Sequence, residues 1–131
     1  MNQYDDYMPP EAYDDMPPQM DLYVEEQQLR AKLDEYIEEY RRCGIEHAKR
    51  DREYYILKAQ KTLELKDDGM PATVISQVIK GVGSVAEARE KMLVAEVMTR
   101  AALEAVLSAK LQLKLVDSQL QREYSTPQAG Y

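Results

Sequence analysis

Apolar residues in the last third of the chain recur at intervals of seven positions. Two such series run side by side, three positions apart: Ala88, Ala95, Ala102 and Ala109, and Val85, Met92, Thr99, Val106, Leu113 and Leu120. Alternating steps of three and four residues are typical of a helix that packs along another helix. The small alanine side chains predict a close approach of the two backbones. We expect one long helix over about residues 84–124.

A further apolar stripe lies on the same predicted helix, outside these two series: Leu93, Val97, Leu103, Leu107, Leu111 and Leu115. One antiparallel partner helix covers one stripe. The other stripe also needs a cover, and a second copy of the chain is the simplest one. We therefore expect a homo-oligomer, in its simplest form a dimeric antiparallel bundle.

Another long helix is predicted over about residues 21–67, because its central part holds no proline and is rich in helix formers. Its packing positions are Leu22, Leu29, Leu33, Tyr36, Tyr40 and Cys43, followed after His47 and Arg50 by Tyr54 and Leu57. Gly44 leaves open whether this helix is continuous or kinked. Together with Ala48 it also offers room for a neighbouring backbone.

The sequence Asp67-Asp68-Gly69-Met70-Pro71 predicts the end of one helix and the start of the next. Gly69 suits a left-handed cap, and Pro71 suits a first helical turn. We expect a short apolar helix over about 71–80, and a capping box of Ser84 and Glu87 for the last helix. The predicted fold is all-α: a long antiparallel helical hairpin over 21–124, with a short connecting helix, an alanine-rich coiled-coil seam and an oligomeric bundle.

The net charge of −7 is concentrated at the N-terminus. Residues 1–26 hold eight acids and no base, whereas the remaining 105 residues hold sixteen acids and seventeen bases. Two Pro-Pro pairs within residues 1–20 forbid a helix, and the composition cannot bury a core. We expect 1–20 to be a disordered acidic arm and 125–131 to be a flexible tail.

The arm contains a short repeat, in which Tyr4-Asp5-Asp6-Tyr7-Met8-Pro9-Pro10 returns as Tyr13-Asp14-Asp15-Met16-Pro17-Pro18. Paired acids can steer toward a basic rim, a Met or Tyr side chain can anchor, and proline reduces the entropy lost on docking. We expect the Tyr, Asp and Met residues of both copies to bind a protein partner. The alternative is an acidic tail that only raises solubility.

Five basic residues gather in the first long helix: Arg41, Arg42, Lys49, Arg50 and Arg52, with Tyr54 and Tyr55 just after them. Bases interleaved with aromatic residues can bind a single nucleic-acid strand. Helical spacing also offers most of these bases an acid on the same helix, as in Glu38 with Arg42, Glu46 with Arg50, and Lys49 with Glu53. Both interpretations stay open here: a nucleic-acid patch, or a helix face that neutralises itself.

Other kinds of site are less well supported. Residues 69–89 have the order of a helix-turn-helix, but the first turns of its second helix offer only Arg89 and Lys91 for phosphate contact. Glu39, Cys43 and His47 share a helix face and could form half of a metal site, although ordinary packing explains them as well. We expect no metal and no cofactor.

Catalysis is not expected either. One His and one Cys leave no hydrolase triad, and the sequence holds no P-loop and no GxGxxG motif. We therefore expect neither an enzyme nor a small-molecule substrate. A single cysteine, the absence of a basic-then-apolar leader and the lack of a long apolar run predict a soluble cytoplasmic protein.

Three parts of the sequence resemble small uncharacterised helical proteins of tailed bacteriophages and prophages of Gram-positive bacteria. They are the stretch 54–73, which reads YYILKAQKTLELKDDGMPAT, the pair Lys80-Gly81, and the ending LQLK of 111–114 with QREY of 121–124. The shared order is a lysine-rich helix, Gly-Met-Pro, a short helix, Lys-Gly and a long helix, over roughly residues 30–124. The resemblance implies a setting in the host cytoplasm, near single-strand annealing recombinases and single-stranded-DNA-binding proteins.

The arm lies outside that resemblance. Its segment Asp14-Asp15-Met16-Pro17 is similar to the acidic tail tip by which single-stranded-DNA-binding proteins recruit partners, although those tips end in a free carboxylate and this segment is internal. The sequence hypothesis is a non-enzymatic phage accessory protein: an oligomeric helical adaptor whose arm recruits a protein of phage DNA recombination or replication. The alternatives are a single-stranded nucleic-acid binder that uses the 41–55 patch, an inhibitor of a host-defence effector, and a structural scaffold component.

Overall fold

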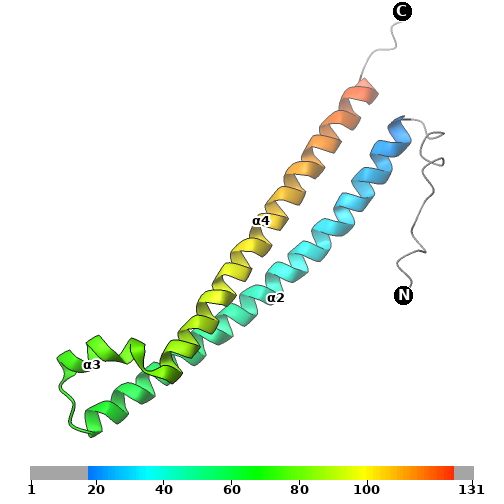
Figure 1. Ribbon diagram of the computed structural model, residues 1–131. Helices are drawn as coiled ribbons and strands as arrows, with labels where there is room; N and C mark the ends of the chain where they lie inside the picture. Colours follow the sequence, from blue (N-terminus) through cyan, green and yellow to red (C-terminus); the bar gives the residue numbers. More distant parts are fainter. Residues whose placement is uncertain (1–17, 126–131) are drawn as a thin grey trace, which may run out of the picture. The chain divides into compact units, whose positions relative to one another are not determined.

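The protein is all-α over the residues that its structure describes. The computed structural model describes residues 18–125, and every structural statement below concerns them. In chain order they form α2 (Pro18–Asp67), α3 (Ala72–Val78), the 3₁₀ turn η1 (Ile79–Gly81) and α4 (Gly83–Ser125) (Figure 1). The first helix begins at Pro18, before the predicted start at about 21, because proline is tolerated in a first helical turn. The rest of the arm predicted over 1–20 and the tail predicted over 125–131, apart from Ser125 in α4, lie outside the described residues.

The chain divides into two compact units, which we describe separately. Within the described residues, the terminal unit holds 18–35 with 107–125, and the hairpin unit holds Tyr36–Val106. Each unit combines a part of α2 with a part of α4. The helices are therefore shared between units, and each unit has a small core of its own.

In the terminal unit the core consists of Leu22, Val116 and Leu120, with the half-buried Leu29 against them. Arg30 on α2 reaches Asp117 on α4 across 3.8 Å. Near the helix ends, the Tyr23 hydroxyl donates a hydrogen bond to the Tyr124 hydroxyl, and the two rings meet edge to face with centroids 6.0 Å apart. This hydrogen bond raises the pKa of Tyr23 above its ordinary value.

In the hairpin unit the chain turns back on itself through α3 and η1 (Figure 1). The core consists of Tyr54 from α2, Ile75 from α3, Ile79 from η1 and Val85 from α4. All four elements thus contribute one buried side chain each. Partly buried residues pack around this cluster: Leu57, Leu65, Met70, Val82, Ala88 and Met92.

The end of α2 follows the predicted cap. Gly69 has a φ of +89°, which only glycine adopts without strain. Its N–H donates to the Lys66 carbonyl at 3.0 Å, and the Met70 N–H donates to the Leu65 carbonyl at 3.1 Å. These two bonds form a Schellman motif. Because Leu65 and Met70 both pack against the hairpin core, the cap also fixes where the chain turns.

Two local predictions need correction. Pro71 precedes α3 as its N-cap residue and does not lie in its first turn. The capping box of Ser84 and Glu87 is absent, because α4 already begins at Gly83 and the Ala86 N–H donates to the Val82 carbonyl at 2.8 Å. Glu87 instead lies 3.6 Å from Lys91.

The predicted packing positions of the two long helices face inward with one exception. On α4 the two seven-residue series are buried or half-buried throughout, and Val116 continues the alanine series with a buried side chain. The polar member Thr99 donates its hydroxyl to the Ala95 carbonyl at 2.8 Å, so it leaves no unpaired polar group. On α2, which is unbroken at Gly44, Tyr40 is exposed, and Ile37 is half-buried. Tyr40 is a single exception, because His47 and Tyr54, which follow it at steps of seven residues, are half-buried and buried.

Candidate functional site

The second stripe of α4 is uncovered in both units. In the terminal unit Leu107, Leu111 and Leu115 are exposed by 48%, 59% and 60%. In the hairpin unit Leu93, Val97 and Leu103 are also exposed. Scattered apolar side chains are normal on a protein surface, but leucines at successive helical turns form a contiguous strip. The strip predicted from the sequence is therefore available to a partner.

The hairpin unit also contains an open groove of about 940 Å³ between α2 and α4. Ile45 lies on its α2 side, and Val94 and Met98 lie on its α4 side. Cys43 and the buried Ala95 complete the apolar lining. Eight charged residues surround these side chains: Glu38, Arg41, Arg42, Glu46 and Arg50 from α2, and Glu87, Glu90 and Lys91 from α4.

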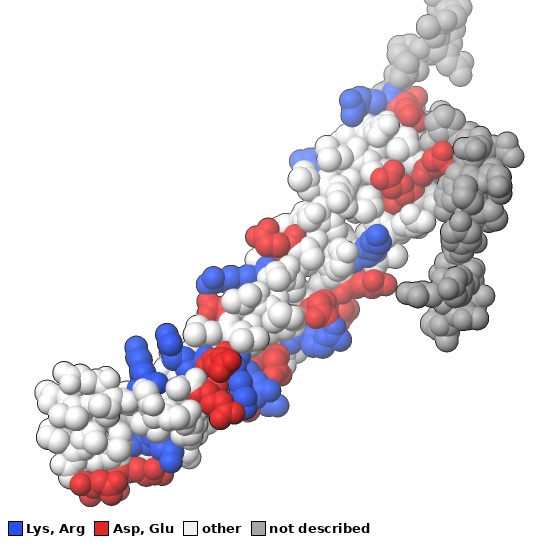
Figure 2. All heavy atoms as spheres, viewed as in Figure 1, with Lys and Arg blue, Asp and Glu red and all other residues white. Residues whose placement is uncertain are grey.

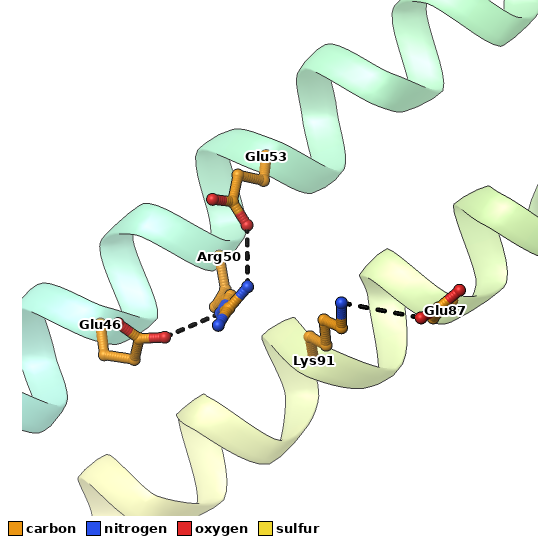
Figure 3. A network of polar contacts seen from close by, with 5 residues as sticks. All are labelled: Glu46, Arg50, Glu53, Glu87 and Lys91. Atoms are coloured by element: carbon orange, nitrogen blue, oxygen red, sulfur yellow. Dashed lines mark hydrogen bonds and ion pairs between the residues drawn. The ribbon is translucent and has the colours of Figure 1, made fainter.

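The ion pairs beside this groove stay within single helices (Figure 3). On α2, Arg50 contacts Glu46 at 2.7 Å and Glu53 at 3.1 Å, and the bond to Glu46 is the larger cause of a raised Arg50 pKa. On α4, Lys91 lies near Glu87. Between residues 36 and 106 no ion pair joins the two helices, so nothing charged bridges the groove.

The predicted nucleic-acid patch is changed by these contacts. Arg41 pairs with Glu38 and Arg42 pairs with Glu39, whereas the sequence spacing had suggested Glu38 for Arg42. The predicted pair of Arg50 with Glu46 is present, but Glu53 contacts Arg50 and not Lys49. Three of the five bases thus have an acid on their own helix. In the face shown in Figure 2, blue and red side chains are interspersed.

The two tyrosines of the predicted patch differ in exposure. Tyr54 is only 5% exposed and belongs to the hairpin core, so its ring cannot stack on a base. Tyr55 remains exposed, while Lys49 and Arg52 are exposed without an ion pair in the described part of the chain. The residues of the patch that are still free to contact nucleic acid are therefore two unpaired cations, Lys49 and Arg52, and one exposed aromatic ring, Tyr55.

The three residues considered as half of a metal site lie on one face of α2 and are all half-buried. The Cys43 thiol donates to a Glu39 carboxylate oxygen at 3.5 Å. Across residues 18–125, His, Cys, Asp and Glu side chains form no group of three that could hold a metal ion.

The repeat residues predicted to bind a partner, Tyr4, Asp5, Asp6, Tyr7, Met8, Tyr13, Asp14, Asp15 and Met16, lie outside the described residues. Sequence reasoning missed the groove residues Ile45, Val94 and Met98. The sequence does contain a weak indication of them. Ile45, Ile56 and Leu63 share one face of α2, and Val94 and Met98 are one turn apart on α4.

Comparisons with family models, with curated proteins and with solved structures give no match. None of the described helices is both long and apolar enough to span a membrane. The residues themselves therefore carry the functional argument.

Proposed function

We propose that this chain is a non-enzymatic helical adaptor that assembles with copies of itself and recruits a protein partner through its N-terminal arm. The observation that carries the proposal is the strip of exposed leucines on α4, with Leu107, Leu111 and Leu115 at its most regular part. A strip of this kind is a favourable surface for a second α4, because helices pack through side chains spaced three and four residues apart.

The size of the cores supports assembly. Among the described residues, the hairpin unit buries seven apolar side chains and the terminal unit four, and three of these eleven are alanines. Burying one large apolar side chain contributes about 1.5–3 kcal/mol, while ordering each residue costs about 1–2 kcal/mol of backbone entropy. A unit with so small a core is stabilised when more apolar surface is buried, and the exposed strip on α4 is an apolar surface that a second copy could bury.

The recruiting role rests on the sequence of the arm. Residues 1–20 hold five acids, and the Tyr, Asp, Met and Pro residues of the repeat occur there in two copies, all before α2 except Pro18. An assembly would present several arms at once, which raises the effective concentration of the motif. For the partner we propose a protein of phage DNA recombination or replication, on the basis of the resemblance and of Asp14-Asp15-Met16-Pro17.

The test compares three baits in an extract of cells that express the chain: the full chain, a chain lacking residues 1–20, and a chain with residues 1–20 in shuffled order. The shuffled arm keeps composition and charge. We expect the full chain alone to retain a specific partner, while all three show the same helical circular dichroism and the same assembly mass. If the chain with the shuffled arm captures the partner equally well, only the charge of the arm matters and its order does not. If the chain lacking residues 1–20 captures the partner equally well, the arm has no part in recruitment.

A second candidate is direct binding of single-stranded nucleic acid, favoured by the exposed Lys49, Arg52 and Tyr55. It predicts anisotropy changes of a labelled oligonucleotide that weaken steeply with salt and that vanish in Lys49→Ala with Arg52→Ala. It also predicts stronger binding when residues 1–26 are removed, because the acidic arm competes with the phosphates. No binding by any form at low salt would exclude it.

A further inference from the structure

Two lysines of the terminal unit line one hollow on the surface of α4. Lys110 and Lys114 lie one helical turn apart, and both side chains are exposed. The hollow has a volume of about 370 Å³, and its lining also includes Leu113, Asp117, Ser118 and Gln121. Within residues 18–125 neither lysine forms an ion pair. We call this surface the lysine hollow.

The sequence around the two lysines explains why they have no partner on their own helix. The residues three and four positions from Lys110 include no acid. For Lys114 the only acid is Asp117, which lies 3.8 Å from Arg30 of α2. The arginines beside the hairpin groove, in contrast, each contact a glutamate of α2. The lysine hollow therefore has a local excess of positive charge, which favours an acidic segment.

An acidic segment is joined to the same unit. Residues 1–17 hold five acids and no base, and they connect to Pro18 at the start of α2. Lys49 and Arg52 are a second unpaired set of cations in the described part of the chain, but they belong to the other unit. A short tether gives a segment an effective concentration on the order of millimolar, so weak contacts between exposed charges are enough to hold it.

The position of the attachment sets the distance that the arm has to cross. In this unit α2 and α4 run antiparallel, with Tyr23 level with Tyr124. At 1.5 Å per residue, Pro18 lies about 22 Å along the helix axis from Lys114. Lys110 lies about 6 Å farther along the same axis.

The two repeats of the arm differ in whether they can cross this distance. An extended chain spans at most about 3.6 Å per residue. In the second repeat, residues 13–18, Asp14 is four residues before Pro18 and reaches no more than about 14 Å. In the first repeat, residues 4–10, Asp6 is twelve residues before Pro18 and reaches up to about 43 Å. Only the first repeat can therefore place its acids beside both lysines.

We infer that the first repeat binds the lysine hollow of its own chain, with Asp5 and Asp6 against Lys110 and Lys114. Leu113, which lies between the two lysines, gives an apolar contact to a Tyr or Met side chain of the repeat. The second repeat is then left for the protein partner, and this division of the arm rests on the recruiting role proposed above. The leucine strip stays available for assembly, because Leu107, Leu111 and Leu115 do not line the hollow.

The experiment places a nitroxide spin label beside the hollow of the full chain and reads the arm by NMR. The label is attached through Ser118→Cys in a chain that also carries Cys43→Ser, since Cys43 is the only native cysteine. At low ionic strength the amide signals of residues 4–8 should lose about half of their intensity or more, and about 1 M salt should restore them. Undiminished signals at low salt would overturn the inference.

Charge reversal identifies the surface. Lys110→Glu with Lys114→Glu should restore the signals of residues 4–8. The matched control is Lys32→Glu with Lys80→Glu, which changes the net charge equally at two exposed lysines outside the hollow. The control should keep the loss of intensity. Equal recovery in both variants would mean that the arm responds to overall charge and would overturn the inference.

The two repeats are compared in the same way. Asp5→Asn with Asp6→Asn should restore the signals of residues 4–8, whereas Asp14→Asn with Asp15→Asn should not. Both variants remove two acids from the arm. Equal effects would contradict the assignment of the first repeat to the hollow.

A mixture of chains identifies whose arm is bound. One chain carries the isotope without the label, and the other carries the label without the isotope. Signals of residues 4–8 should stay undiminished in this mixture, because each arm binds its own chain. A loss equal to that of the doubly marked chain would show that the hollow receives the arm of a second copy, and would overturn the inference.

The result separates this inference from the proposed function. If the arm shows no contact with the hollow but removal of residues 1–20 abolishes capture of the partner, only the inference fails. If the contact is present but removal of residues 1–20 leaves capture unchanged, the recruiting role fails and the contact of the first repeat stands.

Discussion

Gly69 and Gly44 show how differently two glycines can act on one helix. Gly69 ends α2 with a positive φ, and among the described residues it alone has one. Gly44 lies in the middle of α2 with helical geometry, and a methyl group placed there would meet no atom within 4 Å. The conformation of Gly69 requires glycine, whereas no contact among residues 18–125 explains a glycine at position 44.

Replacing Gly69 with alanine should lower the free energy of unfolding by about 1–2 kcal/mol, because a β-carbon in the left-handed region clashes with the following carbonyl. Denaturant unfolding followed by circular dichroism, at one fixed chain concentration, measures the change. An unchanged midpoint would mean that the Schellman cap contributes nothing to the turn between α2 and α3.

At Gly44, alanine is expected to change the free energy of unfolding in the opposite direction. Gly44→Ala should raise the free energy of unfolding by about 0.5–1 kcal/mol, since alanine loses less backbone entropy in a helix and the added methyl has space. The same unfolding measurement applies. A destabilised variant would show that a neighbouring backbone, absent from the single chain, approaches α2 at this residue.

At the scale of helices, periodicity predicted most of what the structure contains. Alanine and larger apolar residues seven apart identified the packed face of α4, and Gly69 with Pro71 identified the turn. Tyr40 is exposed although it belongs to the same seven-residue series as the half-buried His47 and the buried Tyr54, and nothing in the spacing distinguishes it. The sequence allows Tyr54 to be either a packing residue or part of the basic patch. In the structure it packs in one cluster with Ile75 of α3 and Ile79 of η1, which makes it a core residue.

The candidate site was less predictable than the helices. The leucine strip of α4 follows from spacing alone, but the groove depends on which faces of α2 and α4 meet. The partners of the basic residues also depend on geometry, since Arg42 pairs with Glu39, three residues away, and not with Glu38, four residues away. A list of possible pairs along one helix cannot rank contacts of similar, small energy.

Ala102 provides a direct test of the α2–α4 packing in the hairpin unit. It is 8% exposed, while its neighbour Ala101 is exposed. Ala102→Leu should destabilise the fold by about 1–3 kcal/mol because the added atoms have no room at the seam. Ala101→Leu adds the same atoms to the outer face and should change stability by less than about 0.5 kcal/mol. Thermal unfolding at fixed concentration compares them, and equal losses would contradict the assignment of the seam.

In the proposed function, the parts of the whole molecule have separate tasks. The exposed strip on α4 would hold copies of the chain together, and the acidic arm would bind a different protein. Removing the arm is expected to leave assembly intact, and charging the strip is expected to leave each chain helical. The central claim is that the strip on α4 holds copies together.

Sedimentation velocity of the full chain over a wide concentration range tests that claim most directly, with Leu111→Lys plus Leu115→Lys as the comparison. We expect the unsubstituted chain to reach a multiple of 15.1 kDa, and the doubly substituted chain to stay at 15.1 kDa while remaining helical. A substituted chain that assembles as before would contradict the role of the strip. A full chain that stays at 15.1 kDa at every concentration would contradict the assembly itself.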